Sequence, residues 1–363
     1  LNIFNSKLVL ADASTATDDE LERVESVIAH EYFHNWTGNR ITCRDWFQLS
    51  LKEGLTVFRD QSFTSDLHGY GLKRIEDVSF LRNFQFAEDK GPTSHAVKPK
   101  EYVAIDNFYT TTIYEKGAEL VRMLQLLLGK ERFMRGINVY IKTFDGKAAT
   151  TDDFIDSLIK GAYSDEIKPT FDVDKFNNWY YQRGTPKVYV NQSWDEDNSI
   201  LNVSFTQELD SSETNKNIEM VIPILYSCYS SEKEAIPIIK EDLFILDKKN
   251  KNLRIKTLPE EKKPPILSIF RRFSSPVAWQ SDLSLEDYLF LFLNDNDYFT
   301  RWDSGQILMR EIIKSRIDNQ ENHALEDSFI KALKQSIKCL IVEDPFFLST
   351  LLTLPELTEL ESL

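Results

Sequence analysis

Apolar residues recur with a helical period through most of the first half of the chain. Thr17 and Glu20 form a capping-box signature, in which the threonine hydroxyl and the glutamate carboxylate satisfy free backbone N–H groups at a helix start. Apolar residues then recur every three or four positions as far as Phe33, and Gly38 predicts the end of this helix. The same period predicts further helices at 51–63, 111–128, 131–144, 151–159 and 173–182.

Two segments of this half lack the helical period. Apolar and polar residues alternate at 1–11, which predicts a strand. The segment 91–107 contains two prolines and is predicted to be a loop.

After residue 184 the helical period gives way to short alternating segments. These predict strands at 187–191, 200–206, 220–229 and 243–246, separated by polar turns at 195–199, 210–217 and 248–252. Short strands at this spacing are typical of a small β-sandwich. Helical periodicity returns at 284–293, 304–317 and 325–342. The pattern predicts a multidomain chain with a mixed α and β domain at 1–184, a β-sandwich domain at 185–278 and an all-α domain at 279–363.

Composition limits the classes of protein. With 363 residues, of which 42% are hydrophobic and 28% charged, the chain is long enough for two or three domains with buried cores. Its net charge of −15 argues against sequence-independent binding of nucleic acid, whose phosphates would be repelled. No apolar run approaches the ~20 residues that a membrane-spanning helix needs. The 3 cysteines are too few to cross-link a chain of this size, which indicates either a reducing compartment or thiols without a structural role. Of these, we expect a cytoplasmic location, although a targeting signal would lie at an N-terminus that we expect the sequence not to include.

Candidate chemistry begins in the first predicted helix, where His30, Glu31 and His34 form an H-E-x-x-H pattern. Histidines four residues apart lie on one helix face, so two neutral imidazoles can bind one Zn²⁺ there. The intervening glutamate then reaches the open coordination position and can accept the proton of the attacking water. A chance match is the alternative, but chance would leave the remainder of the site without suitable residues.

A third ligand is available on the next predicted helix. Glu53 has apolar neighbours in the sequence, although a glutamate taken alone is more often a solvated surface residue. Two histidines and a glutamate are a known ligand set for catalytic zinc, with the fourth position left for water or substrate. We therefore predict one Zn²⁺ held by His30, His34 and Glu53, with Glu31 as the general base.

These residues are spaced as in the gluzincin metallopeptidases, and the region resembles peptidase family M1, in particular its aminopeptidase N branch. The resemblance is carried by 1–7, 30–60 and 107–119, and more weakly by 273–277 and 299–305. It implies a thermolysin-like α+β zincin fold for the first domain, of which we expect the N-terminal part to be missing, and it implies that 279–363 are the beginning of a longer α-helical domain. It also implies that the substrates are peptides with a free N-terminus, from which single residues are hydrolysed.

The resemblance suggests roles for residues beyond the zinc ligands. Tyr114 occupies the place of the family's catalytic tyrosine, whose hydroxyl helps to stabilise the oxyanion formed when water attacks a peptide carbonyl. Asp60, seven residues after Glu53, is either a partner for a ligand histidine or an exposed acid paired with a neighbouring base. Asp106 stands where the family has asparagine, and it either alters the substrate cleft or caps a local turn.

One family motif is not found in the sequence. Members of the family bind the substrate amine with the glutamate of a Gly-Ala-Met-Glu-Asn motif, because a carboxylate is the strong partner for a positively charged amine. The residues that usually follow this motif are those with which the sequence begins, so we expect an internal part of a longer protein. We also expect the 363 residues alone to have weak peptidase activity or none.

Two other functions stay open on the residues alone. Another gluzincin, an endopeptidase or a relative resembling epoxide hydrolases, would keep the same zinc ligands. A non-enzymatic, metal-stabilised binding scaffold would keep the ligands but would not need Glu31 or Tyr114. Because both of these are present, we expect an enzyme that acts on peptides.

Overall fold

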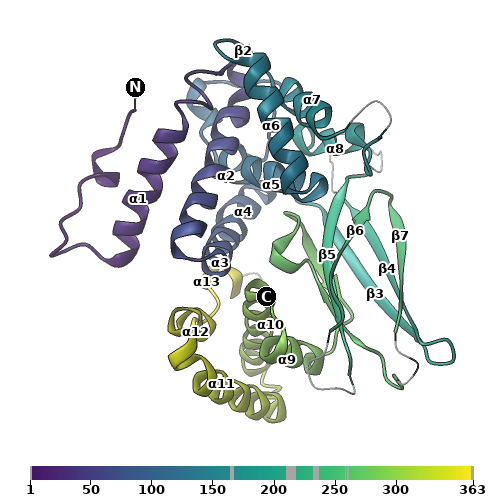
Figure 1. Ribbon diagram of the computed structural model, residues 1–363. Helices are drawn as coiled ribbons and strands as arrows, with labels where there is room; N and C mark the ends of the chain where they lie inside the picture. The colour runs from purple at the N-terminus through teal and green to yellow at the C-terminus, as the bar shows by residue number, and fades with distance from the viewer. Residues whose placement is uncertain are drawn as a thin grey trace.

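Three helices form the framework of the first part of the chain. Helix α1 (Asp18–Phe33) and helix α5 (Gly117–Leu128) pack against the long helix α2 (Leu49–His68), which lies between them (Figure 1). The predicted capping box is present at the start of α1, where Thr17 and Glu20 each accept a hydrogen bond from the other's backbone N–H. The computed structural model describes residues 2–163, 167–209, 218–231, 237–257, 259 and 261–360.

Shorter elements complete this first part, which is almost entirely helical. Two parallel two-residue strands pair with each other, β1 (Thr42–Cys43) and β2 (Ala148–Ala149). The helices are α3 (Tyr70–Phe80), α4 (Phe86–Lys90), α6 (Lys130–Phe144), α7 (Thr151–Ala162) and α8 (Val173–Tyr181). Single turns are η1 (Ser6–Leu8), η2 (Trp46–Gln48) and η4 (Ile105–Phe108), which are 3₁₀-helical, and η3 (Leu81–Gln85) and η5 (Thr112–Lys116), which are π-helical.

Two sequence-based predictions for this part are wrong. The strand predicted at 1–11 is not formed: its described residues contain only the turn η1, and Ile3 is 73% exposed. A strand needs a neighbour to pair its backbone groups, and no strand among the described residues pairs with this segment. The first helix also ends at Phe33 rather than near Gly38, because the chain folds back through a turn at His34 that brings it to α2.

The second part is a sandwich of two sheets (Figure 1). One sheet has the order β7-β4-β3-β9, with β9 parallel to β3, and the other has the antiparallel order β6-β5-β8. The turn predicted at 248–252 is wrong, since β7 already begins at Asn250, and the turn predicted at 210–217 lies outside the described residues. The strands are β3 (Lys187–Asp195), β4 (Ile200–Glu208), β5 (Ile222–Tyr229), β6 (Pro237–Leu246), β7 (Asn250–Lys256), β8 (Ile266–Ile269) and β9 (Ala278–Ser281).

The third part is helical, and it packs on the first part as well as on itself. It consists of α9 (Leu285–Asn294), α10 (Tyr298–Ile317), α11 (His323–Glu343), α12 (Pro345–Leu352) and α13 (Leu357–Leu360). Ile75 and Val78 of α3 share a hydrophobic core with Phe299 and Leu308 of α10. A second core joins α2, α5 and α7 to the sandwich, so both neighbouring parts support the framework that carries α2.

None of the described helices combines the length and the apolar character that a membrane crossing requires.

Candidate metal centre

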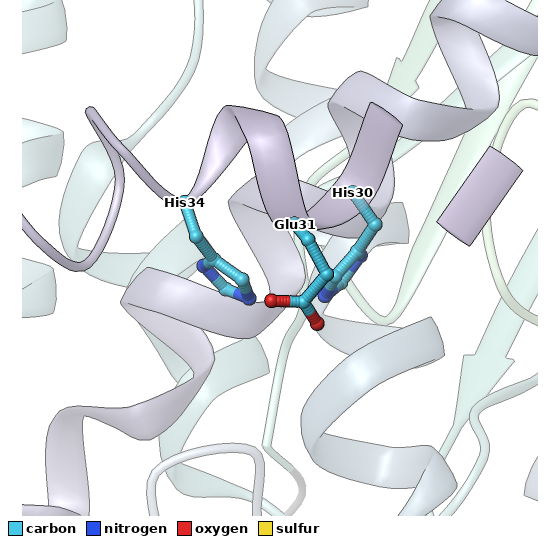
Figure 2. Close-up of side chains that lie close together, drawn as sticks. All are labelled: His30, Glu31 and His34. Atoms are coloured by element: carbon cyan, nitrogen blue, oxygen red, sulfur yellow. The ribbon is translucent and has the colours of Figure 1, made fainter. Parts of the chain in front are cut away.

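The last turn of α1 presents His30, Glu31 and His34 to one space (Figure 2). One nitrogen of each histidine and a Glu31 carboxylate oxygen all lie within 4.8 Å of one another. His34 is the C-cap residue of α1, and the chain turns immediately after it. The helical spacing therefore places the two imidazoles side by side, as the sequence predicts, with ring centroids 4.6 Å apart.

Helix α2 brings a second carboxylate to the same point. Glu53 is 3% exposed, and its Oε2 atom lies 3.1 Å from His34 Nε2 and 3.5 Å from His30 Nε2. Ligand atoms about 2.0 Å from a tetrahedral zinc ion lie about 3.3 Å from one another, so these separations match a zinc ligand set. Its close approach to both nitrogen atoms favours Glu53 as the third ligand and leaves Glu31 beside the open position.

The Nδ1 atom of each histidine, the outer nitrogen on the side away from Glu53, has its own hydrogen-bond partner. His30 Nδ1 lies 2.6 Å from Asp60 Oδ2, and His34 Nδ1 lies 2.9 Å from the carbonyl oxygen of Thr37. An acceptor at Nδ1 keeps a proton on that nitrogen, so Nε2 is the nitrogen that a metal would bind once its own proton has been released. Asp60 is buried, so of its two alternative roles the structure supports contact with a ligand histidine rather than an exposed ion pair.

The charges around the histidines stabilise a cation. Burial lowers the pKa of His30, but hydrogen bonds with Asp60 and Glu53 outweigh this effect and raise it to about 9. Burial raises the pKa of Glu53, but hydrogen bonds from His30 and His34 reverse the shift, and the pKa lies well below its usual range. Burial also raises the pKa of Asp60 to about 6. Positive charge is therefore favoured where Nε2 of His30 meets Glu53, as a metal site requires.

Tyr114 reaches the same cleft from the turn η5. A cavity of about 930 Å³ is lined by residues that include Tyr114, Glu31 and both histidines. Burial and the nearby Glu53 carboxylate raise the pKa of Tyr114 well above its usual range. The phenol therefore keeps its proton near neutral pH and can donate a hydrogen bond.

The loop before η5 contributes a different residue from the one considered in the sequence. Of the described residues of η4 and the segment that follows it, Tyr109 lines the cavity, whereas Asp106 is exposed and is not part of the wall. The side chain that caps the start of this turn is that of Asn107, whose Oδ1 accepts a hydrogen bond from Ala104 N.

Sequence reasoning also missed supporting residues. The Thr56 hydroxyl lies 3.3 Å from His34 Nδ1 and 2.7 Å from the Thr37 hydroxyl, so it holds the turn after α1 against α2. Glu53, Thr56 and Asp60 follow a spacing of i, i+3 and i+7, which places them on one face of α2. This spacing was the signal that could have identified Thr56.

Comparison with known families divides the chain among three models. Residues 1–180 match the peptidase family M1 domain. Residues 184–282 match a domain of unknown function (DUF3458) with an Ig-like fold, and residues 285–363 match a domain with ARM repeats. The α+β zincin class, the β-sandwich and an α-helical domain are therefore confirmed as the fold class of the chain.

Individual relatives agree with these matches. The chain is 42% identical to aminopeptidase N of Caulobacter vibrioides, over 98% of the chain and 40% of the relative. It is 38% identical to aminopeptidase N of Escherichia coli, over 100% of the chain and 42% of the relative. The crystal structure of Legionella pneumophila aminopeptidase A in complex with aspartic acid superposes with a TM-score of 0.83 and 30% identity, over 99% of the chain and 38% of that structure. The chain thus spans about two fifths of the length of these relatives.

Proposed function

The chain belongs to peptidase family M1, and on that premise we propose that His30, His34 and Glu53 bind one Zn²⁺ for the hydrolysis of N-terminal residues from peptides. The observation that carries the proposal is the approach of one Glu53 oxygen to Nε2 of both histidines, at 3.1 and 3.5 Å. The partners of the outer histidine nitrogens further support it, because they orient the imidazoles toward a metal.

The residues around the ion take complementary roles. When bound by these residues, zinc would act as a Lewis acid that activates a water for attack and polarises the substrate carbonyl. Glu31 projects from the same helix turn into this space, where its carboxylate accepts the proton of the attacking water and passes it to the leaving amine. Tyr114 donates a hydrogen bond from its neutral phenol to the oxyanion that forms on the carbonyl oxygen.

Measurement of the bound metal tests the proposal that His30, His34 and Glu53 bind zinc, which every candidate function requires. We expect about one zinc per chain in the protein and a large loss in His34→Ala, whereas His323→Ala, a change at an exposed histidine of α11, keeps its zinc. Zinc content that is the same in His34→Ala and in the parent would contradict the ligand assignment.

Activity tests the class of enzyme. In the full-length protein, Glu31→Gln should lower the rate of release of an N-terminal aminoacyl reporter by about 10²–10⁴-fold while zinc stays bound. Glu131→Gln, at an exposed position of α6, is the matched control and should keep the parent rate. Cleavage of N-terminally blocked peptides with equal efficiency would instead identify an endopeptidase, and zinc binding without any hydrolysis would identify a binding scaffold.

Two further expectations stay predictions. The net charge of −15 argues against a nucleic-acid partner. A cytoplasmic location likewise stays a prediction, because it rests only on the small number of cysteines, Cys43, Cys228 and Cys339.

A further inference from the structure

The turn that carries Tyr114 has an unusual backbone. It is the π-helical turn η5, in which Gly117 N bonds back five residues to the carbonyl of Thr112. It packs against a second π-helical turn, η3, and Gln85 Nε2 of η3 donates to the Thr112 hydroxyl at 3.2 Å. A π-turn inserts one extra residue into a helix, and such turns are rare and often mark functional sites.

The start of η5 is bonded to a carboxylate of another helix. Glu88 of α4 accepts three hydrogen bonds on its Oε2 atom: from the Thr111 hydroxyl at 2.7 Å, from Thr112 N at 2.8 Å and from the Thr112 hydroxyl at 2.7 Å. Thr112 is fully buried, so its N–H must be paired inside the protein. Glu88 therefore serves as an N-terminal cap supplied from outside the helix.

The end of η5 is bonded to the next residue of α4. Lys116 is 1% exposed, and its Nζ donates to Asp89 Oδ2 and to the carbonyl oxygen of Gly184, both at 2.9 Å. Asp89 Oδ2 also accepts from the Thr185 hydroxyl at 2.8 Å. A buried ammonium with these partners is held in one position, because loss of either would leave a buried charge poorly paired.

We propose that the α4 carboxylate pair, Glu88 and Asp89, positions Tyr114 by holding both ends of its π-helical turn. One residue of an α-helix corresponds to a rotation of about 100° around the helix axis. If η5 relaxed to an α-helix, the extra residue of the π-helical turn would be lost, and Tyr114 would turn away from its present direction. Among the described residues, the hydrogen bonds and ion pairs of Glu88 and Asp89 go to other partners than the proposed metal ligands, so the pair acts through Tyr114. This inference rests on the proposed role of Tyr114 as an oxyanion donor.

The hydrogen-exchange rates of the backbone amides of η5 report directly on the stability of this turn, and their measurement needs no catalytic activity. In Glu88→Ala, the amides of Thr112 and Gly117 should exchange faster, whereas the amides of α2 should keep the parent rates. Glu88→Gln keeps an acceptor oxygen and should restore most of the protection. Lys90→Ala, an exposed change on the same helix, is the matched control. Unchanged exchange in both Glu88→Ala and Lys116→Met would overturn the proposal.

A double-mutant cycle in the full-length protein then tests the link to Tyr114. Glu88→Ala should lower kcat by up to about 100-fold with little change in KM and zinc content. The hydrogen bond from Tyr114 to the oxyanion forms only in the transition state, so misplacing Tyr114 weakens binding of the transition state and not of the substrate. Combined with Tyr114→Phe, it should cause no further loss. Losses that multiply would overturn the positioning role while leaving the proposed function intact. A Tyr114→Phe variant with parent kcat would overturn the proposed role of Tyr114 and, with it, the positioning role.

Discussion

His30 Nδ1 and Asp60 Oδ2 lie 2.6 Å apart, and this contact joins the last turn of α1 to the middle of α2. Both side chains are largely shielded from water, with 15% and 10% of their surfaces exposed. The carboxylate fixes the ring orientation of His30 and makes its Nε2 a better electron donor toward a metal. The helix that supplies the proposed ligand Glu53 thus also orients one of the proposed histidine ligands.

Asp60→Asn is expected to weaken zinc binding by about 10–100-fold, because the amide keeps the shape but not the charge of the partner of His30. The measurement is competition for zinc with a chelator of known affinity. Asp66→Asn, at an exposed position of the same helix, is the matched control and should bind zinc as the parent does. Equal zinc affinities of Asp60→Asn and the parent would show that the contact between Asp60 and His30 does not affect zinc binding.

Zinc binding is expected to release a proton. The pKa of His30 is raised to about 9, so at neutral pH its ring carries a proton that a metal at Nε2 must displace. The apparent affinity for zinc should therefore rise by up to tenfold per pH unit until about pH 9. Calorimetric titration in buffers of different ionisation enthalpy measures the number of protons released. A heat of binding that does not depend on the buffer at pH 7 would contradict this prediction.

The proposed zinc ligands and the general base could be identified from the sequence because local helix geometry decides their placement. His30, Glu31 and His34 lie within a single turn, and a capping box fixes the start of their helix. Glu53 could be proposed because it lies on the next helix of the chain. For the two histidines and Glu31 one short segment contained the information needed, whereas the placement of Glu53 also depends on the packing of α2 against α1.

Other features could not be predicted because distant parts of the chain determine them. Helix α3 was missed: its Arg74 and Asp77 resemble solvated residues in the sequence, but both are buried. Arg74 is buried because Glu119 of α5 binds it through two 2.6 Å contacts and the carbonyl of Phe273 accepts a third hydrogen bond. The π-helical turn at Tyr114 likewise depends on α4, which has no sequence signal linking it to that turn.

Glu115 is expected to make the protein less stable as pH rises. Burial and the nearby carboxylates of Asp77 and Asp60 raise its pKa to about 8 from its ordinary value of 4.5. Between these values the folded state binds more protons than the unfolded state, so the free energy of unfolding falls with pH, by at most about 1.4 kcal/mol per unit. Urea unfolding from pH 5 to pH 9 measures this slope.

A neutral isostere isolates this effect. Glu115→Gln should reduce the slope and be more stable than the parent at pH 8 and above, since the amide never ionises. Its oxygen can still accept from Gln61 Nε2, which lies 3.3 Å from Glu115 Oε2. Glu131→Gln, at an exposed position, should leave the slope unchanged. A Glu115→Gln variant with the parent slope would show that Glu115 ionises normally in the folded protein.

Gly54 is expected to be required for the close approach of α2 to α5. A Cβ atom at Gly54 would lie 2.8 Å from the backbone carbonyl carbon of Gly117, a distance at which one of the two helices must shift. Gly54 follows Glu53, and Gly117 follows the turn that carries Tyr114. Gly54→Ala should therefore destabilise the protein by about 1–3 kcal/mol, the usual cost of overpacking, and should also separate the two sides of the proposed site.

Two measurements distinguish this effect from a general loss of stability. At a temperature where Gly54→Ala is still folded, kcat of the full-length protein should fall more than zinc content, because the shift separates Glu53 from Tyr114 without removing a ligand. Gly91→Ala is the matched control, since a Cβ there meets its nearest atom at an ordinary 3.4 Å. Parent-like stability and kcat in Gly54→Ala would mean that α2 and α5 can separate freely, and the close packing of the two helices would then have no part in positioning the site.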